Sequence, residues 1–455
     1  MAANSAQWIH MVGIAGAGMS GIARVLKEQG NKVTGSDLQK NDVSKKLEEI
    51  GIQIYEGHSS SNLQEGVDLL VISSAVPLDN IEVETAKKCG IPVLKRGEML
   101  ARMANAGKGV AVAGAHGKTT TTSMIYAALQ SCGGDPTYIV GGELQDSDLN
   151  AHLGQGEYFV VEADESDASF LALHPYIAVV TNIEDDHLDF YKSFERIKTA
   201  FQTFLQQTDT GGFVLLNGGD PSLREIGRSA AGRVLFYGED DSLDYHLRNW
   251  RVKGMGSVFE AYRSGEYLGQ IELSVPGRHN AWNALAALAV AMELGCSFDV
   301  VAKSLVNFHG AKRRFQIMGH MGSNVIVDDY AHHPTEIRAT IKAAHDLGFN
   351  RLVVVFQPHR YTRTKLLAEQ FSISFELADL VIITDIYSAG EKPIAGIDSQ
   401  MICKLAVQKG ANMIYMQSQG EIEEFIRREI KNNELVITMG AGDIWKLGEK
   451  LADVK

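Results

Sequence analysis

A glycine-rich stretch in the first third of the chain carries the clearest chemistry. An apolar run over 109–113 is followed by Gly114-Ala115-His116-Gly117-Lys118-Thr119-Thr120 and then by residues that favour a helix. A Walker A loop has four residues between its first glycine and the Gly-Lys-Ser/Thr, and this stretch has two. The glycines still permit a tight turn, Lys118 can meet phosphates, and a threonine hydroxyl can bind Mg²⁺. We expect a shortened nucleoside-triphosphate loop at a helix N-terminus; a glycine turn capped by threonine is the alternative.

Two acidic stretches could supply the other ligands that Mg²⁺ needs. E-A-D-E-S-D begins at Glu162, directly after an apolar run, and N-I-E-D-D-H-L-D spans 182–189 after the next one. Most of these acids are expected to be solvated or to cap helices. Glu162 and His187 stand out, because Glu162 emerges straight from a strand and His187 ends a run of carboxylates.

A second glycine loop follows the first apolar run of the chain. Gly16-Ala17-Gly18-Met19-Ser20-Gly21 satisfies G-x-G-x-x-G, and Asp37 ends the next strand-like run. Taken alone, this segment favours a nicotinamide dinucleotide. The groups that such a loop offers do not select a dinucleotide, because backbone N–H groups and a helix N-terminus can bind any pyrophosphate. Another nucleotide, such as a UDP-sugar, and purely structural glycines remain open.

Bulk composition limits the class of protein. The chain has 455 residues, of which 45% are hydrophobic and 22% charged, which suggests about three domains. A net charge of −13 gives no overall footprint for nucleic acid. We expect a cytoplasmic protein, since no apolar run is long enough to cross a bilayer and residues 1–7 do not form a signal peptide. The four cysteines are far apart in sequence, and we expect them to be unpaired.

The order of apolar runs and glycine turns predicts an α/β fold with parallel sheets. Short alternating runs over 248–276 predict an antiparallel addition, and a helix is expected over 280–294. Polar groups gather after the strand ends, where open α/β sheets bind ligands. The expected strands cover 9–14, 32–37, 68–73, 158–162, 177–182, 212–217, 324–329, 351–356, 380–384 and 434–438.

Taken in order, the motifs resemble those of the Mur ligases, the ATP-dependent amide-forming enzymes of peptidoglycan precursor synthesis. The resemblance covers essentially the whole chain, and D-D-Y-A-H-H-P with F-Q-P-H-R-Y-T-R-T resembles the branch that adds L-alanine. A related enzyme that recycles a tripeptide is less similar at the arginine motif. Further matching segments are H-N-A-W-N-A-L-A-A (279–287), G-A-K-R-R-F (310–315), V-D-D-Y-A-H-H-P-T-E (327–336), F-Q-P-H-R-Y-T-R-T (356–364), T-D-I-Y-S-A-G-E (384–391) and G-A-G-D-I (440–444).

The resemblance implies three domains and one reaction. Residues 1–104 would form a Rossmann-like domain for UDP-N-acetylmuramate, 105–312 a central P-loop ATPase-type domain, and 313–455 a Rossmann-like domain that binds the amino acid and closes over ATP. ATP would phosphorylate the lactyl carboxylate, and L-alanine would attack the acyl phosphate. The substrates would be ATP, UDP-N-acetylmuramate and L-alanine, with two Mg²⁺ ions, no nucleic acid or membrane partner, and a monomeric or homodimeric state.

The resemblance also implies a role for each candidate residue. The catalytic group would be Lys118, Glu162, His187, Arg314 and His332. ATP would contact residues 114–120, with Arg314 at phosphate, Asn280 at adenine and Asp329 at ribose. Thr119 and Glu162 would hold one Mg²⁺ and His187 a second. The UDP-sugar would contact Gly16, Ala17, Gly18, Met19, Ser20, Asp37, Ser73, Ser74, Arg96 and His187. The amino acid would contact Tyr330, His332, His359, Arg360 and Arg363.

Plainer interpretations stand beside these roles. Asn280 could cap the helix that follows it, Asp329 could cap a turn, and Arg314 could pair with a surface acid. Two other classes of function also remain: a nicotinamide-dependent oxidoreductase, supported only by the first glycine loop, and a non-catalytic nucleotide-binding protein that has kept the fold.

Overall fold

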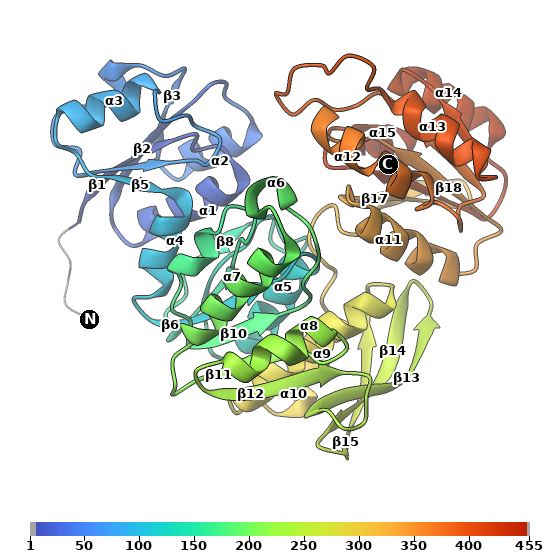
Figure 1. Ribbon diagram of the computed structural model, residues 1–455, viewed down its shortest axis with the longest axis horizontal. Coiled ribbons are helices and arrows are strands. Elements are labelled where there is room, and N and C mark those ends of the chain that lie inside the picture. Colours follow the sequence, from blue (N-terminus) through green and yellow to red (C-terminus); the bar gives the residue numbers. More distant parts are fainter. Residues whose placement is uncertain (1–5, 453–455) are drawn as a thin grey trace. The chain divides into compact units, whose positions relative to one another are not determined.

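The computed structural model describes residues 6–452 and contains three β-sheets with helices packed beside them (Figure 1). Residues 1–5 of the segment expected to lack a signal peptide lie outside the described part. Contacts divide the chain into two compact units, which we describe separately. The first is Met1–Arg248, Glu260–Gln270 and Trp282–Leu305, and the second is Asn249–Phe259, Ile271–Ala281 and Val306–Lys455. The three-domain boundaries predicted from the sequence therefore stay a prediction.

The first sheet is parallel throughout and has the strand order β3-β2-β1-β4-β5. β2 and β3 are added on one side of β1, and β4 and β5 on the other, so the strand order reverses beside β1. Ligands bind such sheets at this reversal, and the glycine loop after β1 lies there. The strands are β1 (Trp8–Val12), β2 (Lys32–Asp37), β3 (Gln53–Glu56), β4 (Leu69–Ile72) and β5 (Val93–Lys95). The helices are α1 (Ala17–Glu28), α2 (Asp42–Glu49), η1 (Ser60–Asn62), α3 (Ile81–Lys88) and α4 (Arg96–Ala104).

The second sheet has ten strands in the order β15-β14-β13-β12-β11-β10-β6-β9-β7-β8. Its strands are β6 (Lys108–Ala113), β7 (Thr137–Ile139), β8 (Ala151–His152), β9 (Tyr158–Glu162), β10 (Ile177–Val180), β11 (Phe213–Asn217), β12 (Arg233–Gly238), β13 (Tyr245–Lys253), β14 (Gly256–Arg263) and β15 (Glu266–Leu273). Its helices are α5 (Lys118–Ser131), η2 (Ser169–Ala172), α6 (Leu188–Tyr191), α7 (Phe194–Gln206), α8 (Pro221–Ile226), η3 (Gly227–Ser229), α9 (Arg278–Glu293) and α10 (Phe298–Val306).

The neighbours of β6 decide where the phosphate loop lies. β6 is parallel to β9 on one side, with Val112 opposite Glu162, and parallel to β10 on the other, with Ala113 opposite Val180. The loop after Ala113 therefore leaves the sheet between the two acidic stretches that follow β9 and β10. These strands are short and largely apolar, as expected for a parallel sheet buried on both faces.

The third sheet belongs to the second unit and has the order β16-β17-β21-β18-β19-β20. β16 pairs antiparallel with β17, and the other pairs are parallel. The strands are β16 (Gln316–Met321), β17 (Asn324–Asp329), β18 (Arg351–Phe356), β19 (Leu380–Ile383), β20 (Met413–Tyr415) and β21 (Glu434–Met439). The helices are α11 (Pro334–Asp346), α12 (Tyr361–Ser372), α13 (Ser399–Gln408), α14 (Gln419–Glu429) and α15 (Trp445–Leu451).

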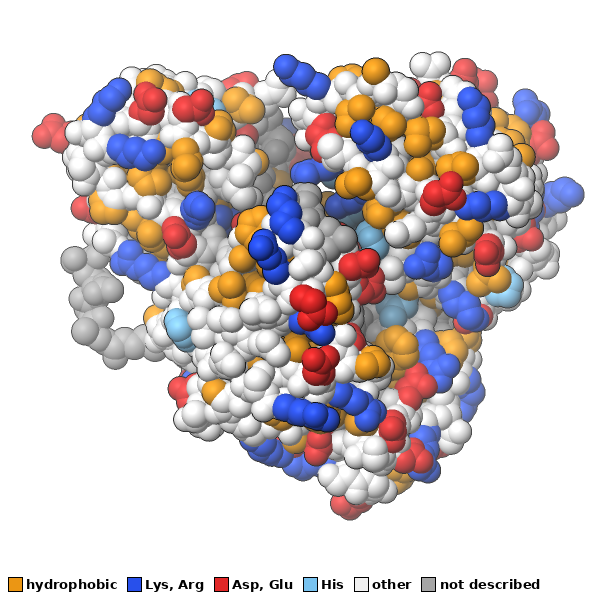
Figure 2. All heavy atoms as spheres, in the orientation of Figure 1, with side chains coloured by type: hydrophobic (Ala, Val, Ile, Leu, Met, Phe, Trp, Pro, Cys, Tyr) orange, Lys and Arg blue, Asp and Glu red, His pale blue; other side chains and the backbone are white. Residues whose placement is uncertain are grey.

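The predicted α/β class is confirmed, and the expected strands are present within two residues at each end. Three successive strands, β13 to β15, occupy the segment for which an antiparallel addition was expected. Within residues 6–452, no helix is long and apolar enough to span a bilayer. On the face shown in Figure 2, acidic and basic side chains are interspersed over the surface.

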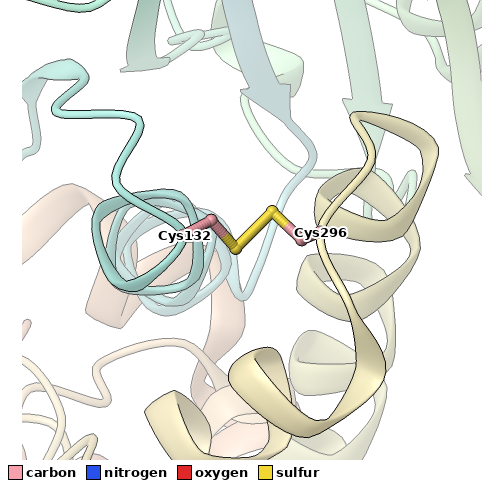
Figure 3. The surroundings of a disulfide bond; sticks show 2 residues. All are labelled: Cys132 and Cys296. Carbon is pink, nitrogen blue, oxygen red and sulfur yellow. A yellow bond between two sulfur atoms is a disulfide. The ribbon is translucent and has the colours of Figure 1, made fainter.

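The prediction that all four cysteines are unpaired is wrong. A disulfide joins Cys132, at the C-terminal end of α5, to Cys296 in the turn after α9 (Figure 3). The two residues are 164 positions apart in sequence, but the fold brings their Cα atoms to 6.0 Å, a separation that a disulfide can span. Spacing along the chain carried no sign of this proximity. Cys89 and Cys403 are free thiols.

Replacing Cys132 by Ser should lower the free energy of unfolding under oxidising conditions. A cross-link that closes so long a loop restricts the unfolded chain, and its loss costs up to about 5 kcal/mol. Urea unfolding of Cys132→Ser against Cys403→Ser measures the difference, and reductant should affect only the second variant. Alkylation of four cysteines in denatured, unreduced wild-type protein would contradict the pairing.

Candidate functional site

The phosphate loop is held against the end of β10 by side chains. The side-chain amide of Asn182 makes two hydrogen bonds to the backbone of His116 in the loop. Its Oδ1 accepts from His116 N at 2.9 Å, and its Nδ2 donates to His116 O at 2.9 Å. Thr181 Oγ1 also donates to His116 O. A Cβ on Gly114 would lie 2.2 Å from Thr181 Oγ1, so the loop can approach β10 this closely only with glycine there.

Lys118 begins α5 directly after Gly117, which has a left-handed φ of 81°. Its ammonium donates to the carbonyls of Gly114 (2.5 Å) and Ala115 (3.3 Å) and to Glu165 Oε1 (2.9 Å). Burial opposes the charge on this lysine, but the neighbouring carboxylates, Glu165 above all and then Asp164 and Glu162, together raise the pKa of Lys118 above its usual value. The side chain is therefore a cation at neutral pH.

Two of the expected magnesium ligands lie beside the loop. Glu162 ends β9, and its Oε1 accepts from Gly141 N at 3.0 Å. The next residue, Gly142, approaches Thr119, because a Cβ on it would lie 3.7 Å from the Thr119 methyl carbon. A carboxylate and a hydroxyl next to a phosphate loop fit a Mg²⁺ ion, which prefers hard oxygen ligands.

His187, the third expected metal ligand, has the left-handed φ of 56° that non-glycine residues rarely adopt. Its Nε2 lies 3.5 Å from Asp186 Oδ2 and 3.8 Å from Glu165 Oε1. Strained backbone at a polar strand end is typical of functional sites. The structure thus brings His187 to the carboxylate that holds Lys118.

One cavity of about 340 Å³ joins the two glycine loops of the first unit. From the first loop it is lined by Gly16, Ala17, Gly18 and Met19, with Ser73, Ser74 and Arg96 close by, and from the second by Lys118, Glu162 and Asp164. Both halves of the predicted site therefore face the same space.

The side chains around the first loop are already engaged. Arg96 lies over Gly18, where a Cβ would meet its Cδ at 3.1 Å, and its Nη2 pairs with Asp164 Oδ2 at 2.7 Å. Asp37 Oδ2 accepts from Ala15 N at 3.0 Å. Ser20 Oγ accepts from Asn150 Nδ2 at 2.9 Å. The Asp37 carboxylate is therefore bonded to the backbone at the start of the first glycine loop.

In the second unit, three strand ends meet at one edge of the third sheet. β21 lies between β17 and β18, with Met439 opposite both Asp329 and Phe356. Arg313 ties this edge together: its guanidinium binds Asp328 Oδ2 at 2.9 Å, Gly442 O at 3.0 Å and Gly440 O at 2.6 Å. The motifs G-A-K-R-R-F, V-D-D-Y-A-H-H-P and G-A-G-D-I thereby form one polar cluster.

The plainer interpretation holds for Asp329, whereas Arg314 pairs with an acid that is only 12% exposed and Asn280 lies inside the first turn of α9 instead of before it. Asp329 accepts from Phe315 N and Ala331 N, both at 2.8 Å, and burial raises the pKa of Asp329 to about 6. Arg314 Nη1 lies 3.4 Å from Glu336 Oε1. Asn280 Nδ2 donates to Pro276 O at 2.7 Å. Their roles toward ATP remain predictions.

The residues expected to bind the amino acid gather at the same sheet edge. The rings of His332 and His359 have centroids 6.0 Å apart, and His359 stacks on Tyr387 at 5.8 Å. Arg363 Nη1 lies 3.5 Å from His359 Nδ1. Arg360 has a φ of 69° and immediately precedes α12.

His332 is arranged to act through Nε2. Its Nδ1 lies 3.0 Å from the carbonyl of Tyr330. Because a carbonyl only accepts, Nδ1 carries the proton and Nε2 keeps its lone pair. Burial lowers the pKa of His332 to about 4, in spite of the opposing effect of Glu336. The ring is therefore neutral at physiological pH.

Some residues that shape the site were not singled out from the sequence. Glu165 pairs with Lys118, Asn182 holds the loop, and Arg313 joins the ends of β17 and β21. Glu165 and Asn182 belonged to runs of similar polar residues, and Arg313 stands next to a second arginine. Composition gave no way to choose among such neighbours, because the choice depends on which strand lies beside which.

A phosphate loop flanked by carboxylates, sharing a cavity with a second glycine loop, defines a nucleotide-dependent α/β enzyme. Family models match in sequence order: Mur ligase family, catalytic domain, over 8–108; Mur ligase middle domain over 112–291; and Mur ligase, glutamate ligase domain, over 313–442. The chain belongs to the Mur ligase family.

Individual relatives agree with this assignment. The chain is 58% identical over 457 residues to a UDP-N-acetylmuramate–L-alanine ligase of Syntrophomonas wolfei, with 100% of this chain and 98% of the relative covered. Among solved structures it is similar to UDP-N-acetylmuramate-alanine ligase MurC from Thermotoga maritima (30% identity, 97% of each chain, TM-score 0.83). It is also similar to a murein peptide ligase from Psychrobacter arcticus (25% identity, 99% of each chain, TM-score 0.72).

The stability of the chain should fall on acidification through His332. Its pKa is about 4 when folded and about 6.5 when unfolded, so its contribution is complete above pH 6.5 and is lost as the pH falls toward 4. Urea unfolding of His332→Asn at several pH values should show a shallower loss, by up to about 1.4 kcal/mol per pH unit. His345→Asn, an exposed histidine on α11, is the control; equal slopes for His332→Asn and wild type would contradict the expectation.

Proposed function

We propose that this chain is an ATP-dependent ligase that joins L-alanine to the lactyl carboxylate of UDP-N-acetylmuramate. The cavity shared by the two glycine loops carries the proposal. A phosphate loop on one side suits ATP, and a pyrophosphate-binding loop on the other suits a UDP-sugar. The names of the relatives supply the identity of the substrates. A dinucleotide oxidoreductase would leave the loop at Gly114–Lys118 without a role.

The reaction requires that a carboxylate oxygen become a leaving group. ATP phosphorylates the lactyl carboxylate to an acyl phosphate, the amine of L-alanine attacks the carbonyl carbon, and phosphate leaves. Phosphoryl transfer depends chiefly on positioning and on neutralising charge. Lys118, beside the cavity, and Arg314 are the cations that we assign to the phosphates.

Magnesium supplies further positive charge when it is bound. We assign one ion to Thr119 and Glu162, whose oxygens flank the phosphate loop, and a second to His187. These side chains would hold the metal, while Asn182 and Thr181 keep the loop in place. Asn280 and Asp329 are assigned to the adenine and ribose of ATP.

The first glycine loop is assigned to the UDP-sugar. Its backbone N–H groups at residues 16–20, the start of α1, and Arg96 would face the pyrophosphate, with Ser73 and Ser74 at the end of β4. Asp37 shapes the loop through Ala15 N. We place the reaction in the cytoplasm, where ATP is available, and expect a monomer or homodimer.

The amino acid is assigned to the edge of the third sheet. An arginine can donate two parallel hydrogen bonds to a carboxylate, and we assign that role to Arg360 and Arg363. His332 presents a neutral Nε2 that can orient the amine or accept its proton. Tyr330 and His359 complete the set.

Phosphate release with ATP, Mg²⁺, UDP-N-acetylmuramate and a panel of amino acids tests the function. L-Alanine should support turnover, and NAD or NADP should neither bind nor react. Lys118→Ala should reduce turnover by at least about 100-fold, because the phosphates lose their cation. Folding of the variant is checked by circular dichroism. Near-normal turnover in the folded variant would refute the role of Lys118, and turnover with a tripeptide but not L-alanine would refute the substrate.

Removing one carboxylate-binding arginine should weaken the use of L-alanine selectively. Arg360→Ala and Arg363→Ala should raise the KM for L-alanine by about tenfold or more and change the KM for UDP-N-acetylmuramate little, since a charge-assisted hydrogen bond is worth about 1.5–3 kcal/mol. Steady-state kinetics with each substrate varied in turn measures both constants. Arg338→Ala, on α11, is the matched control. If both variants keep the L-alanine KM of wild type, the amino acid binds elsewhere.

A further inference from the structure

Every hydrogen that Lys118 can donate is in use. A protonated lysine has three N–H donors. In the structure they bind the carbonyls of Gly114 and Ala115 and the carboxylate of Glu165. The lysine therefore cannot bind a phosphate without giving up one of these three acceptors.

Glu165 differs from the two carbonyls in charge and in setting. Its side chain is 5% exposed, and within residues 6–452 its Oε2 is buried without a hydrogen-bond partner. Its backbone carbonyl is fixed by Tyr191 Oη at 2.5 Å and by Ala168 N at 3.1 Å. The carboxylate is thus held next to the lysine by a rigid turn, and Lys118 is its nearest compensating charge.

We propose that Glu165 is an internal counter-ion that competes with the phosphates of the nucleotide for Lys118. The inference rests on the proposed function, in which Lys118 binds phosphate. The exchange replaces a carboxylate by a phosphate oxygen at the ammonium and breaks no covalent bond. Glu165 is a positioning residue in this scheme, because it acts on the nucleotide through Lys118.

Competition for Lys118 determines whether loss of the Glu165 charge strengthens or weakens nucleotide binding. In the proposed exchange, nucleotide binding breaks the Lys118–Glu165 ion pair and brings phosphate charge close to a carboxylate that has lost its partner. Both contributions oppose binding, since a buried charge without compensation is costly. Removing the negative charge of Glu165 should therefore tighten nucleotide binding, and most strongly when Lys118 is present. A ligand of Mg²⁺ at this position would act in the opposite direction.

The test is a double-mutant cycle on the full chain, with ADP as the probe and calorimetry as the measurement. The variants are Glu165→Gln, Lys118→Met and the combination, each studied with Mg²⁺ and with a chelator. Glu165→Gln should lower the Kd for ADP by about fivefold or more when Lys118 is present. In the Lys118→Met background the same change should have a smaller effect, because only the repulsion between phosphate and carboxylate is then relieved.

Glu184→Gln is the matched control, since it also removes a carboxylate from the surroundings of the loop, where Glu184 lies 3.3 Å from His116. Its effect on the Kd should be the same in both backgrounds. Glu165→Asp, which keeps the charge but shortens the side chain, serves if Glu165→Gln does not fold. It should also tighten ADP binding, because the shorter carboxylate pairs less closely with Lys118.

The outcomes separate the inference from the proposed function. An unchanged Kd in Lys118→Met would refute the assignment of phosphate to Lys118. A weakened Kd in Lys118→Met with no gain from Glu165→Gln would refute only the competition. If Glu165→Gln binds ADP more weakly than wild type with Mg²⁺ but not with the chelator, Glu165 is a metal ligand. That result would also refute the competition.

Discussion

The geometry of the first unit depends on the packing of β6 between β9 and β10. Parallel strands bring their carboxyl ends to one edge, so the loop that leaves β6 must pass between the residues that follow its neighbours. Asn182 then fixes the loop from the β10 side, and Glu162 and Glu165 face it from the β9 side. A loop two residues shorter than a Walker A loop keeps its lysine at the helix start because these neighbours, rather than loop length, hold it.

In the third sheet, the loops at the strand ends are held together by the guanidinium of Arg313. The ends of β17, β21 and β18 carry glycines, carboxylates and histidines whose backbones have little local regularity. Arg313 joins the ends of β17 and β21 by binding the Asp328 carboxylate and the carbonyls of Gly440 and Gly442. Two adjacent arginines therefore have different tasks: the first holds the edge together, and the second remains 32% exposed.

Sequence reasoning succeeded where a pattern is local. The strands at Tyr158–Glu162, Asn324–Asp329 and Arg351–Phe356 have the predicted bounds, because a buried parallel strand is a short apolar run. The loop lysine and the two glycine loops could be found for the same reason. The Cys132–Cys296 bond could not, because it depends on the ends of two helices 164 residues apart. Nor could the sequence separate Glu165 from the acids beside it, since only the partner across the sheet edge distinguishes them.

Three cations that we assign to phosphate groups each pair with a carboxylate. Lys118 is paired with Glu165, Arg96 with Asp164, and Arg314 with Glu336. Each of these cations thus has a compensating carboxylate beside it. Where phosphate replaces Glu165 at Lys118, as we propose, the gain in binding is the difference between two ion pairs rather than the value of one. Such a site favours ligands with several phosphate or carboxylate oxygens in the right places, because a single oxygen gains little over the residue that it displaces.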